Sequence, residues 1–202
     1  MAPPSSAVLR DRLLALHRAG RTRLALTQLN NHLQQHPADV DLWALGGALA
    51  LEAGLDPSAE QMVSAALQRD ADHAEALILR GTLDERAGRL EQAIARYEQL
   101  LRQRPDHALA ERKRAFCLQR AGRNAEAERA LHRVLRRAPD DPEILEVLAS
   151  LLFARNDLET AEATAVKALR GNQRSASAAL TLARIILKRE RPDEVLGGAD
   201  RP

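Results

Sequence analysis

Apolar residues recur three or four positions apart along almost the whole chain, in segments separated by short polar turns. The clearest stretch, residues 74–107, reads AEALILRGTLDERAGRLEQAIARYEQLLRQRPDH, with helical spacing on both sides of the Ala87-Gly88-Arg89 turn. Glycine supplies the left-handed backbone that ends a helix, and Pro105 stops the second helix. The apolar runs all have helical spacing, so no strand is predicted. The pattern therefore predicts an all-α chain of paired antiparallel helices.

These helix pairs follow a period of 34 residues. The turn residues that mark the period are Gly20, Gly54, Gly88, Gly122 and Asn156. The prolines at 37, 105 and 139 are spaced by multiples of the same 34 residues. The period defines repeats at 6–39, 40–73, 74–107, 108–141 and 142–175, followed by a terminal helix at 176–190. We expect residues 1–5 to be a disordered N-terminus and 191–202 to be a tail or linker. Because one helical hairpin cannot bury its own apolar face, the repeats are expected to stack into a single elongated domain.

Two further columns keep the same spacing in the second helix of each hairpin. The small-residue column is Ala25, Ala59, Ala93, Ala127 and Ala161, and eight residues later stand Leu33, Leu67, Leu101, Leu135 and Leu169. Small residues let two helices approach closely, and a leucine two turns on is expected to close the same seam.

The arrangement resembles the tetratricopeptide repeat family, whose pattern runs Trp-x2-Leu-Gly-x2-Tyr, then Ala-x3-Phe, and finally Pro. Trp43, Gly47, Gly81 and Tyr97 stand at family positions, and the resemblance extends from Ser6 to about residue 190. It implies a right-handed α-solenoid, a superhelix of stacked antiparallel hairpins. Glu111 replaces the usual aromatic residue, so the start of the fourth repeat is expected to pack less tightly.

The resemblance also implies where a partner binds, because positions 2, 5, 9, 12 and 13 of each repeat line a concave groove in this family. Among the residues that carry over to these positions are Asp41, Ala44, Ala48, Glu52, Ile78, Thr82, Glu85, Arg86, Arg112, Phe116 and Arg120. A floor that is apolar in its middle and charged at its edges suits an extended or helical peptide. For Phe116, core packing and a role as an aromatic anchor both stay open. The asparagines with which one subgroup of the family clamps chaperone tails are absent, which disfavours that activity.

Charge and composition narrow the function further. The net charge of +2 conceals bands, since the second repeat has six acidic residues and one basic residue, whereas the fourth has nine basic and five acidic. A solvated outer face and the steering of an acidic partner both account for such bands. No apolar run approaches the roughly 20 residues that span a bilayer, and the first five residues lack the apolar core of a secretory signal. We expect a cytoplasmic protein that does not bind membranes.

No catalytic constellation, cofactor motif or metal site is predicted. The sequence lacks a phosphate-binding glycine loop, a nucleophile elbow and a cysteine pair. His32 and His36 stand four residues apart, but no third ligand is evident, so helix-end histidines are favoured over a metal site. The single cysteine, Cys117, is expected to be a buried apolar thiol.

Three classes of function remain. The first is a non-enzymatic scaffold that binds a peptide or helix of a partner protein in the groove and acts on no small-molecule substrate. The second is the N-terminal adaptor of a larger enzyme of the glycosyltransferase, sulfotransferase or hydroxylase type. The third, an RNA-binding helical repeat, is disfavoured because four aromatic residues leave little for base stacking. The apolar terminal helix also predicts self-association, or pairing with a further domain.

Overall fold

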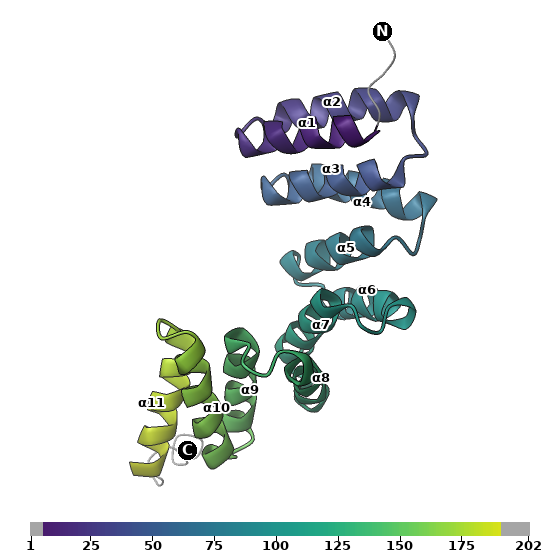
Figure 1. Cartoon of the computed structure of the whole chain (residues 1–202). Helices are drawn as coiled ribbons and strands as arrows, with labels where there is room; N and C mark the ends of the chain where they lie inside the picture. The colour runs from purple at the N-terminus through teal and green to yellow at the C-terminus, as the bar shows by residue number, and fades with distance from the viewer. Residues whose placement is uncertain (1–5, 191–202) are drawn as a thin grey trace, which may run out of the picture. The chain divides into compact units, whose positions relative to one another are not determined.

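The computed structural model describes residues 6–190, and this part of the chain is entirely helical (Figure 1). Its helices are α1 (Ser6–Arg18), α2 (Thr22–Gln35), α3 (Val40–Glu52), α4 (Asp56–Arg69), α5 (Ala74–Arg86), α6 (Leu90–Gln103), α7 (Ala108–Arg120), α8 (Asn124–Arg137), α9 (Pro142–Ala154), α10 (Leu158–Gly171) and α11 (Ala176–Glu190). Every odd-numbered helix begins at the first residue of a predicted repeat. The all-α class and the 34-residue period are therefore confirmed. The predicted N-terminal segment 1–5 and tail 191–202 lie outside the described residues.

The turn inside each complete hairpin has one residue in the left-handed region. The φ angles are 73° at Gly20, 71° at Gly54, 74° at Gly88, 75° at Gly122 and 68° at Asn156. A Cβ placed on any of these four glycines would meet nothing within 4 Å, so backbone conformation rather than crowding explains the glycine. At Gly88, the amides of Gly88 and Arg89 donate to the carbonyls of Glu85 and Asp84, at 3.1 and 2.8 Å, and close the end of α5.

The residue before each of the later first helices caps that helix. Asp39 and Asp141 accept hydrogen bonds from backbone amides at 3.1 and 3.3 Å, and the Ser175 hydroxyl accepts one at 3.0 Å. The Nδ1 atoms of His73 and His107 accept the equivalent bond at 3.3 Å. All five residues are 34 apart, so position 34 of the repeat is an N-cap position. The two histidines thus have a structural role that the sequence pattern did not reveal.

The chain divides into two compact units, Met1–Ala110 and Glu111–Pro202. In the first, α1 packs on α2, α3 on α4 and α5 on α6, and the hairpins stack through α2 with α3 and α4 with α5. In the second, α9 packs on α10, and α11 contacts both. The border falls inside α7, beside Glu111. The Glu111 side chain is buried, and it accepts hydrogen bonds from Arg133 at 2.9 Å and Arg137 at 2.8 Å within the second unit.

The two predicted seam columns differ in burial. All five alanines of the small-residue column are completely buried, as is Cys117. In the leucine column only Leu33 is buried, and the other four are partly exposed. The predicted burial of the alanines between the paired helices is confirmed. The leucines, Leu33 apart, lie at the margin of the helix contact, where they stay partly exposed.

Candidate functional site

The first helices of the unit Met1–Ala110 pack side by side, because α3 contacts both α1 and α5. Ala48 on α3 and Ile78 on α5 are half-buried, which leaves a shallow apolar strip. Thr82 stands beside it, with its hydroxyl bonded to the Ile78 carbonyl at 2.9 Å. Ala44 is different, since it is completely buried in a cluster with Ala66 and Ala76. Ala44 therefore lies in the core and contributes no surface that a partner could contact.

The carboxylates predicted at the edge of this strip all have partners within the unit. Asp41 accepts from His73 Nε2 at 3.0 Å, and Glu52 accepts from His17 Nε2 at 2.9 Å. Their side chains stay 81% and 67% exposed, so these hydrogen bonds are weak and can be exchanged for a ligand. Glu85 accepts the Tyr97 hydroxyl at 2.7 Å.

Arg86 is also bound to its own chain. One of its terminal nitrogens lies 2.8 Å from Asp56 Oδ1 and 3.2 Å from the Leu51 carbonyl. The guanidinium therefore joins the third repeat to the second. This pairing reduces the positive charge that the sequence assigned to the groove at Arg86.

The predicted residues of the unit Glu111–Pro202 fall into two groups. Arg112 forms ion pairs with Asp141, at 3.3 Å, and with Glu143, while its guanidinium lies 5.9 Å from the centre of the Phe116 ring. Phe116 is half-buried, so it is neither a core residue nor a freely exposed anchor. Arg120 is exposed and makes no hydrogen bond or ion pair within the described residues.

A second cationic and aromatic cluster lies further along the same unit, outside the groove residues predicted from the sequence. Half-buried Phe153 on α9 lies beneath two cations of α11, with Arg184 Cζ 4.7 Å and Lys188 Nζ 5.4 Å from the ring centre. Leu180 and Leu187 on α11 are 61% and 56% exposed. We call Phe153, Leu180, Arg184, Leu187 and Lys188 the Phe153 surface. Phe153 occupies position 12 of the fifth repeat, and the other four occupy positions 5, 9, 12 and 13 when the terminal helix is counted from Ala176 in the same way. Extending the family's groove rule to the fifth repeat and the terminal helix would therefore have found them.

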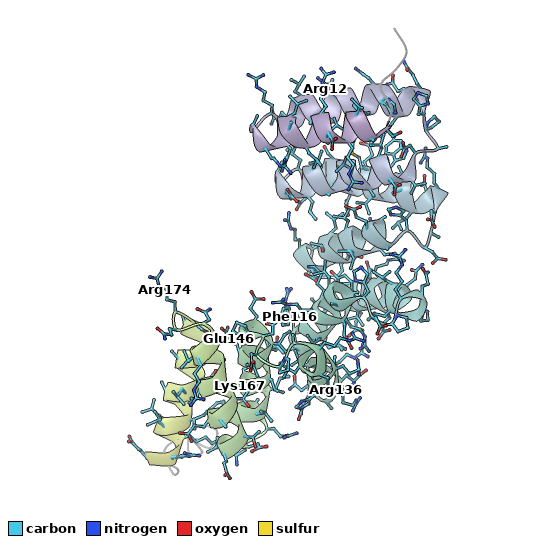
Figure 2. All side chains as sticks on the ribbon, in the orientation of Figure 1. Arg12, Phe116, Arg136, Glu146, Lys167 and Arg174 are labelled. Carbon is cyan, nitrogen blue, oxygen red and sulfur yellow. The ribbon has the colours of Figure 1, made fainter. Side chains whose placement is uncertain are left out.

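The two cations of the Phe153 surface have no counter-ion among residues 6–190. Neither Arg184 nor Lys188 forms an ion pair with any carboxylate of residues 6–190. Both cations lie over the aromatic ring, an arrangement worth about 0.5–1 kcal/mol when exposed. Exposed Arg136 on α8 and exposed Arg174, in the turn between α10 and α11, make no such ring contact within residues 6–190 (Figure 2).

The described part of the chain supports neither a metal site nor a membrane-spanning helix. No three His, Cys, Asp or Glu side chains there are close enough to hold a metal ion, and the rings of His32 and His36 lie 4.5 Å apart without a third ligand. No helix there has the length and apolar character needed to cross a membrane.

Comparison with known proteins identifies the family. Two models, each described as tetratricopeptide repeat, match residues 49–108 and 86–151 and together span half of the chain. No curated protein matches the chain in sequence.

Three solved structures illustrate the similarity of fold. PilW, described as a widely conserved type IV pilus biogenesis factor, superposes with a TM-score of 0.79 at 20% identity, over 96% of this chain and 91% of its own. PilF of Pseudomonas aeruginosa gives 0.74 at 18% identity, over 94% and 93% of the two chains. YrrB, described as a TPR protein with an unusual peptide-binding site, gives 0.73 at 15% identity, over 85% and 88%. With its 34-residue period, its left-handed turns and these matches, the chain belongs to the tetratricopeptide repeat family.

Proposed function

We propose that this protein is a non-enzymatic scaffold that binds a segment of a partner protein on the first-helix surface. The repeat fold supports the general role, because stacked hairpins present a row of first helices as an extended binding surface. One structural neighbour, YrrB, carries a peptide-binding site according to its description.

The Phe153 surface is the observation that carries the proposal. It combines a half-buried aromatic ring, two cations that have no counter-ion among residues 6–190, and two exposed leucines. Aromatic residues and arginine are enriched among the residues that dominate binding energy at interfaces. Cations without internal partners attract an acidic ligand, since a ligand carboxylate need not displace a carboxylate of the protein.

The partner segment that fits this surface is acidic and apolar. Its apolar side chains would pack on Leu180 and Leu187, and its carboxylates would pair with Arg184 and Lys188. By contrast, a ligand that approaches Arg112 or Arg86 must compete with Glu143 and Asp56. We therefore place the main contact on α9 and α11, and a weaker one at Phe116 and Arg120.

The test begins with a photo-reactive amino acid at Ser150, which is half-buried on α9 one turn before Phe153. The cross-linked segment of the partner is identified, synthesised and titrated against variants of the full chain. Reversal of two charges, R184E with K188E, should weaken binding at least about tenfold and flatten its salt dependence. The variant F153A should also weaken binding, with the salt slope unchanged.

The matched control reverses two exposed arginines of α8, R129E with R136E, which changes the net charge by the same amount. This control should change the affinity for the partner segment by no more than about twofold, because the reversed charges act on the segment only over a distance at which salt screens them. If the control pair abolishes binding while F153A and the R184E, K188E pair do not, the partner binds elsewhere and the first-helix proposal is wrong.

Self-association through α11 would use a neighbouring face of the same helix. Ile186 is 46% exposed and stands at position 11, where the equivalent residues Ala50, Leu118 and Leu152 are buried. Sedimentation over a range of protein concentrations separates the two cases: I186E should dissociate a homodimer built on this face, while leaving the affinity for a partner bound at Phe153 unchanged.

A further inference from the structure

Two cavities of the unit Met1–Ala110 lie one repeat apart on the side of the second helices. The first, about 410 Å³, lies between α2 and α4, and the second, about 320 Å³, lies between α4 and α6. Five of the eight lining residues of each cavity correspond at a spacing of 34: Asn30 with Ser64, Leu33 with Leu67, Gln34 with Gln68, Trp43 with Leu77, and Met62 with Arg96. The repeat has therefore built the same furrow twice.

The chemistry of the two furrows differs where the first and second helices meet. In the first furrow, Met62 fills the space above Gly46, since a Cβ on Gly46 would lie 2.3 Å from the Met62 sulfur. In the second, Arg80 replaces that glycine and Arg96 replaces that methionine, and both arginines line the cavity. An apolar contact in one repeat has become a cationic pocket in the next.

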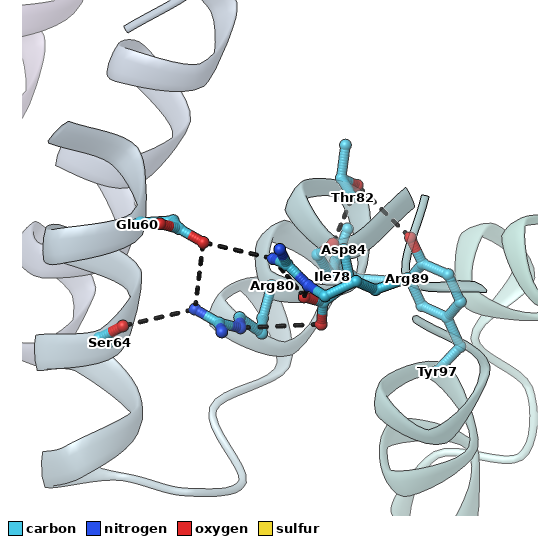
Figure 3. Close-up of polar contacts among 8 residues, drawn as sticks. All are labelled: Glu60, Ser64, Ile78, Arg80, Thr82, Asp84, Arg89 and Tyr97. Carbon is cyan, nitrogen blue, oxygen red and sulfur yellow. Dashed lines mark hydrogen bonds and ion pairs between the residues drawn. The ribbon is translucent and has the colours of Figure 1, made fainter. Parts of the chain in front are cut away.

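The two guanidiniums of this pocket are poorly satisfied by the protein itself. The Nε atom of Arg96 is buried and has no hydrogen-bond partner, and Arg96 forms no ion pair within the described residues. Arg80 makes only long contacts, 3.7 Å from its Nε to Asp84 Oδ2, 4.0 Å from Nη1 to Glu60 Oε1 and 3.5 Å from Nη1 to the Ser64 hydroxyl (Figure 3). A buried donor without a partner has lost its hydration without compensation, so such a group is expected to bind an external acceptor.

The nearby carboxylates do not neutralise the pocket, because a third arginine holds them. Arg89 lies 2.8 Å from Asp84 Oδ1 and 3.3 Å from Glu60 Oε1, both shorter than the contacts from Arg80 (Figure 3). Arg80 and Arg89 therefore share Glu60 and Asp84, whereas Arg96 pairs with no carboxylate among the described residues. Exposed Asp72 stands at the rim, where its Oδ1 accepts from Gln99 at 3.0 Å. Arg80, Arg89 and Arg96 outnumber Glu60 and Asp84 by one charge, and the solvent-screened carboxylate of exposed Asp72 offsets this surplus only in part, so the site suits a single monoanion.

We propose that the pocket between α4 and α6, which we call the Arg80–Arg96 pocket, binds the side-chain carboxylate of an acidic residue in a partner-protein segment. A carboxylate matches the two guanidiniums, and its methylene stem packs on the apolar floor of Leu67 and Leu77. Phosphate fits less well, because its second charge meets Glu60, Asp84 and Asp72. The pocket lies on the second-helix side, apart from the first-helix surface, so it provides a separate contact.

The binding test uses the nitrogen and hydrogen signals of the arginine Nε–H groups in the full chain. N-acetyl-glutamate amide, whose only charge is its side-chain carboxylate, is titrated at constant ionic strength. N-acetyl-glutamine amide is the neutral control, and inorganic phosphate is the alternative anion. The glutamate probe should shift the Arg96 Nε–H signal to saturation, and the glutamine probe should not. Equal shifts with both probes, or tighter binding of phosphate, would overturn the proposal.

Substitution gives the second arm. The variant R96M copies the methionine of the preceding repeat and should weaken binding of the glutamate probe about tenfold or more, followed through the Arg80 Nε–H signal. The control, R102M, removes an exposed arginine from the same helix and should bind the probe as the unsubstituted chain does. Equal weakening in both variants would show general electrostatic attraction rather than a pocket. If R96M fails to fold, the titration of the unsubstituted chain still decides the question.

Discussion

The second and third repeats have the same helical hairpin, but different side chains lie between the two helices of each hairpin. The second repeat has Gly46 and Ala50 on its first helix, whereas the third has Arg80 and Asp84 at the same two positions. Ala50 and Asp84 are both completely buried. In the second repeat apolar packing is sufficient, whereas in the third a buried carboxylate requires arginines around it.

The difference shows how a repeat acquires a recognition site without changing its fold. A buried ion pair contributes little to stability compared with apolar residues of similar volume, because both charges lose their hydration. The third repeat accepts this cost and keeps an unsatisfied guanidinium at a cavity. A site that conflicts with the packing rules is a candidate for function rather than for stability.

The largest expected effect comes from R89M in the third repeat. The bond with Asp84 raises the pKa of Arg89, and removal of this cation leaves a buried carboxylate with only the long contact to Arg80. Urea denaturation should show a greater loss of stability than G81A or Y97F produces. The double variant D84A, R89M, which restores the alanine of the second repeat, should recover most of that loss. If R89M alone is neutral, Asp84 does not depend on Arg89.

The second expected effect distinguishes the glycines of the two repeats. A Cβ on Gly81 would lie 2.5 Å from two ring carbons of fully buried Tyr97, so G81A should cost about 1–3 kcal/mol. On Gly46 the Cβ would meet the ends of the flexible Met62 and Leu29 side chains, at 2.3 and 2.5 Å. Those ends can move, so G46A should cost less, while the gain of about 1 kcal/mol in helix propensity is the same for both substitutions. Equal losses of thermal stability in G81A and G46A would mean that the side chains facing the two glycines move aside equally easily.

A third, smaller effect should have the opposite sign. The variant R96M removes the buried Nε donor that has no partner and should raise the free energy of unfolding by about 1 kcal/mol, even as it removes the pocket. The reverse change in the second repeat, M62R, provides the comparison and should destabilise the chain. A loss of stability in R96M would show that Arg96 contributes more by packing than its unpaired nitrogen costs.

The smallest effect concerns the polar end of the ring that Gly81 accommodates. The Tyr97 hydroxyl donates to Glu85 at 2.7 Å, and Y97F removes this bond while keeping the ring. A loss of about 0.5–1 kcal/mol is expected, because Glu85 stays partly exposed and is rehydrated. Chemical denaturation at neutral pH measures it, and a loss several times larger would indicate that the bond holds α6 against α5.

The sequence predicted the scaffold well because backbone geometry repeats. Positive φ at Gly88 and close approach at Ala93 depend on local rules that one residue satisfies. The side-chain partners were less predictable, since Arg86 reaches Asp56 across a whole repeat and chooses among several carboxylates by distances that only the fold sets. Ala44 was predicted wrongly for a related reason, because the depth of a groove position depends on the size of the neighbouring helix's side chains, which vary from repeat to repeat. Phe153 was missed because the groove positions were not carried over to the fifth repeat.

The left-handed turns have one further consequence, which concerns chirality. At Gly20, Gly54, Gly88 and Gly122 the backbone has the conformation that a mirror-image amino acid prefers, and an added Cβ meets no neighbour. D-Alanine introduced at Gly88 by chemical ligation should therefore fit without strain. It should stabilise the fold by about 0.4–1 kcal/mol through restriction of the unfolded chain, whereas L-alanine at the same place should destabilise it. A scaffold of this kind could thus be stiffened at its hairpin tips without alteration of any surface that a partner contacts.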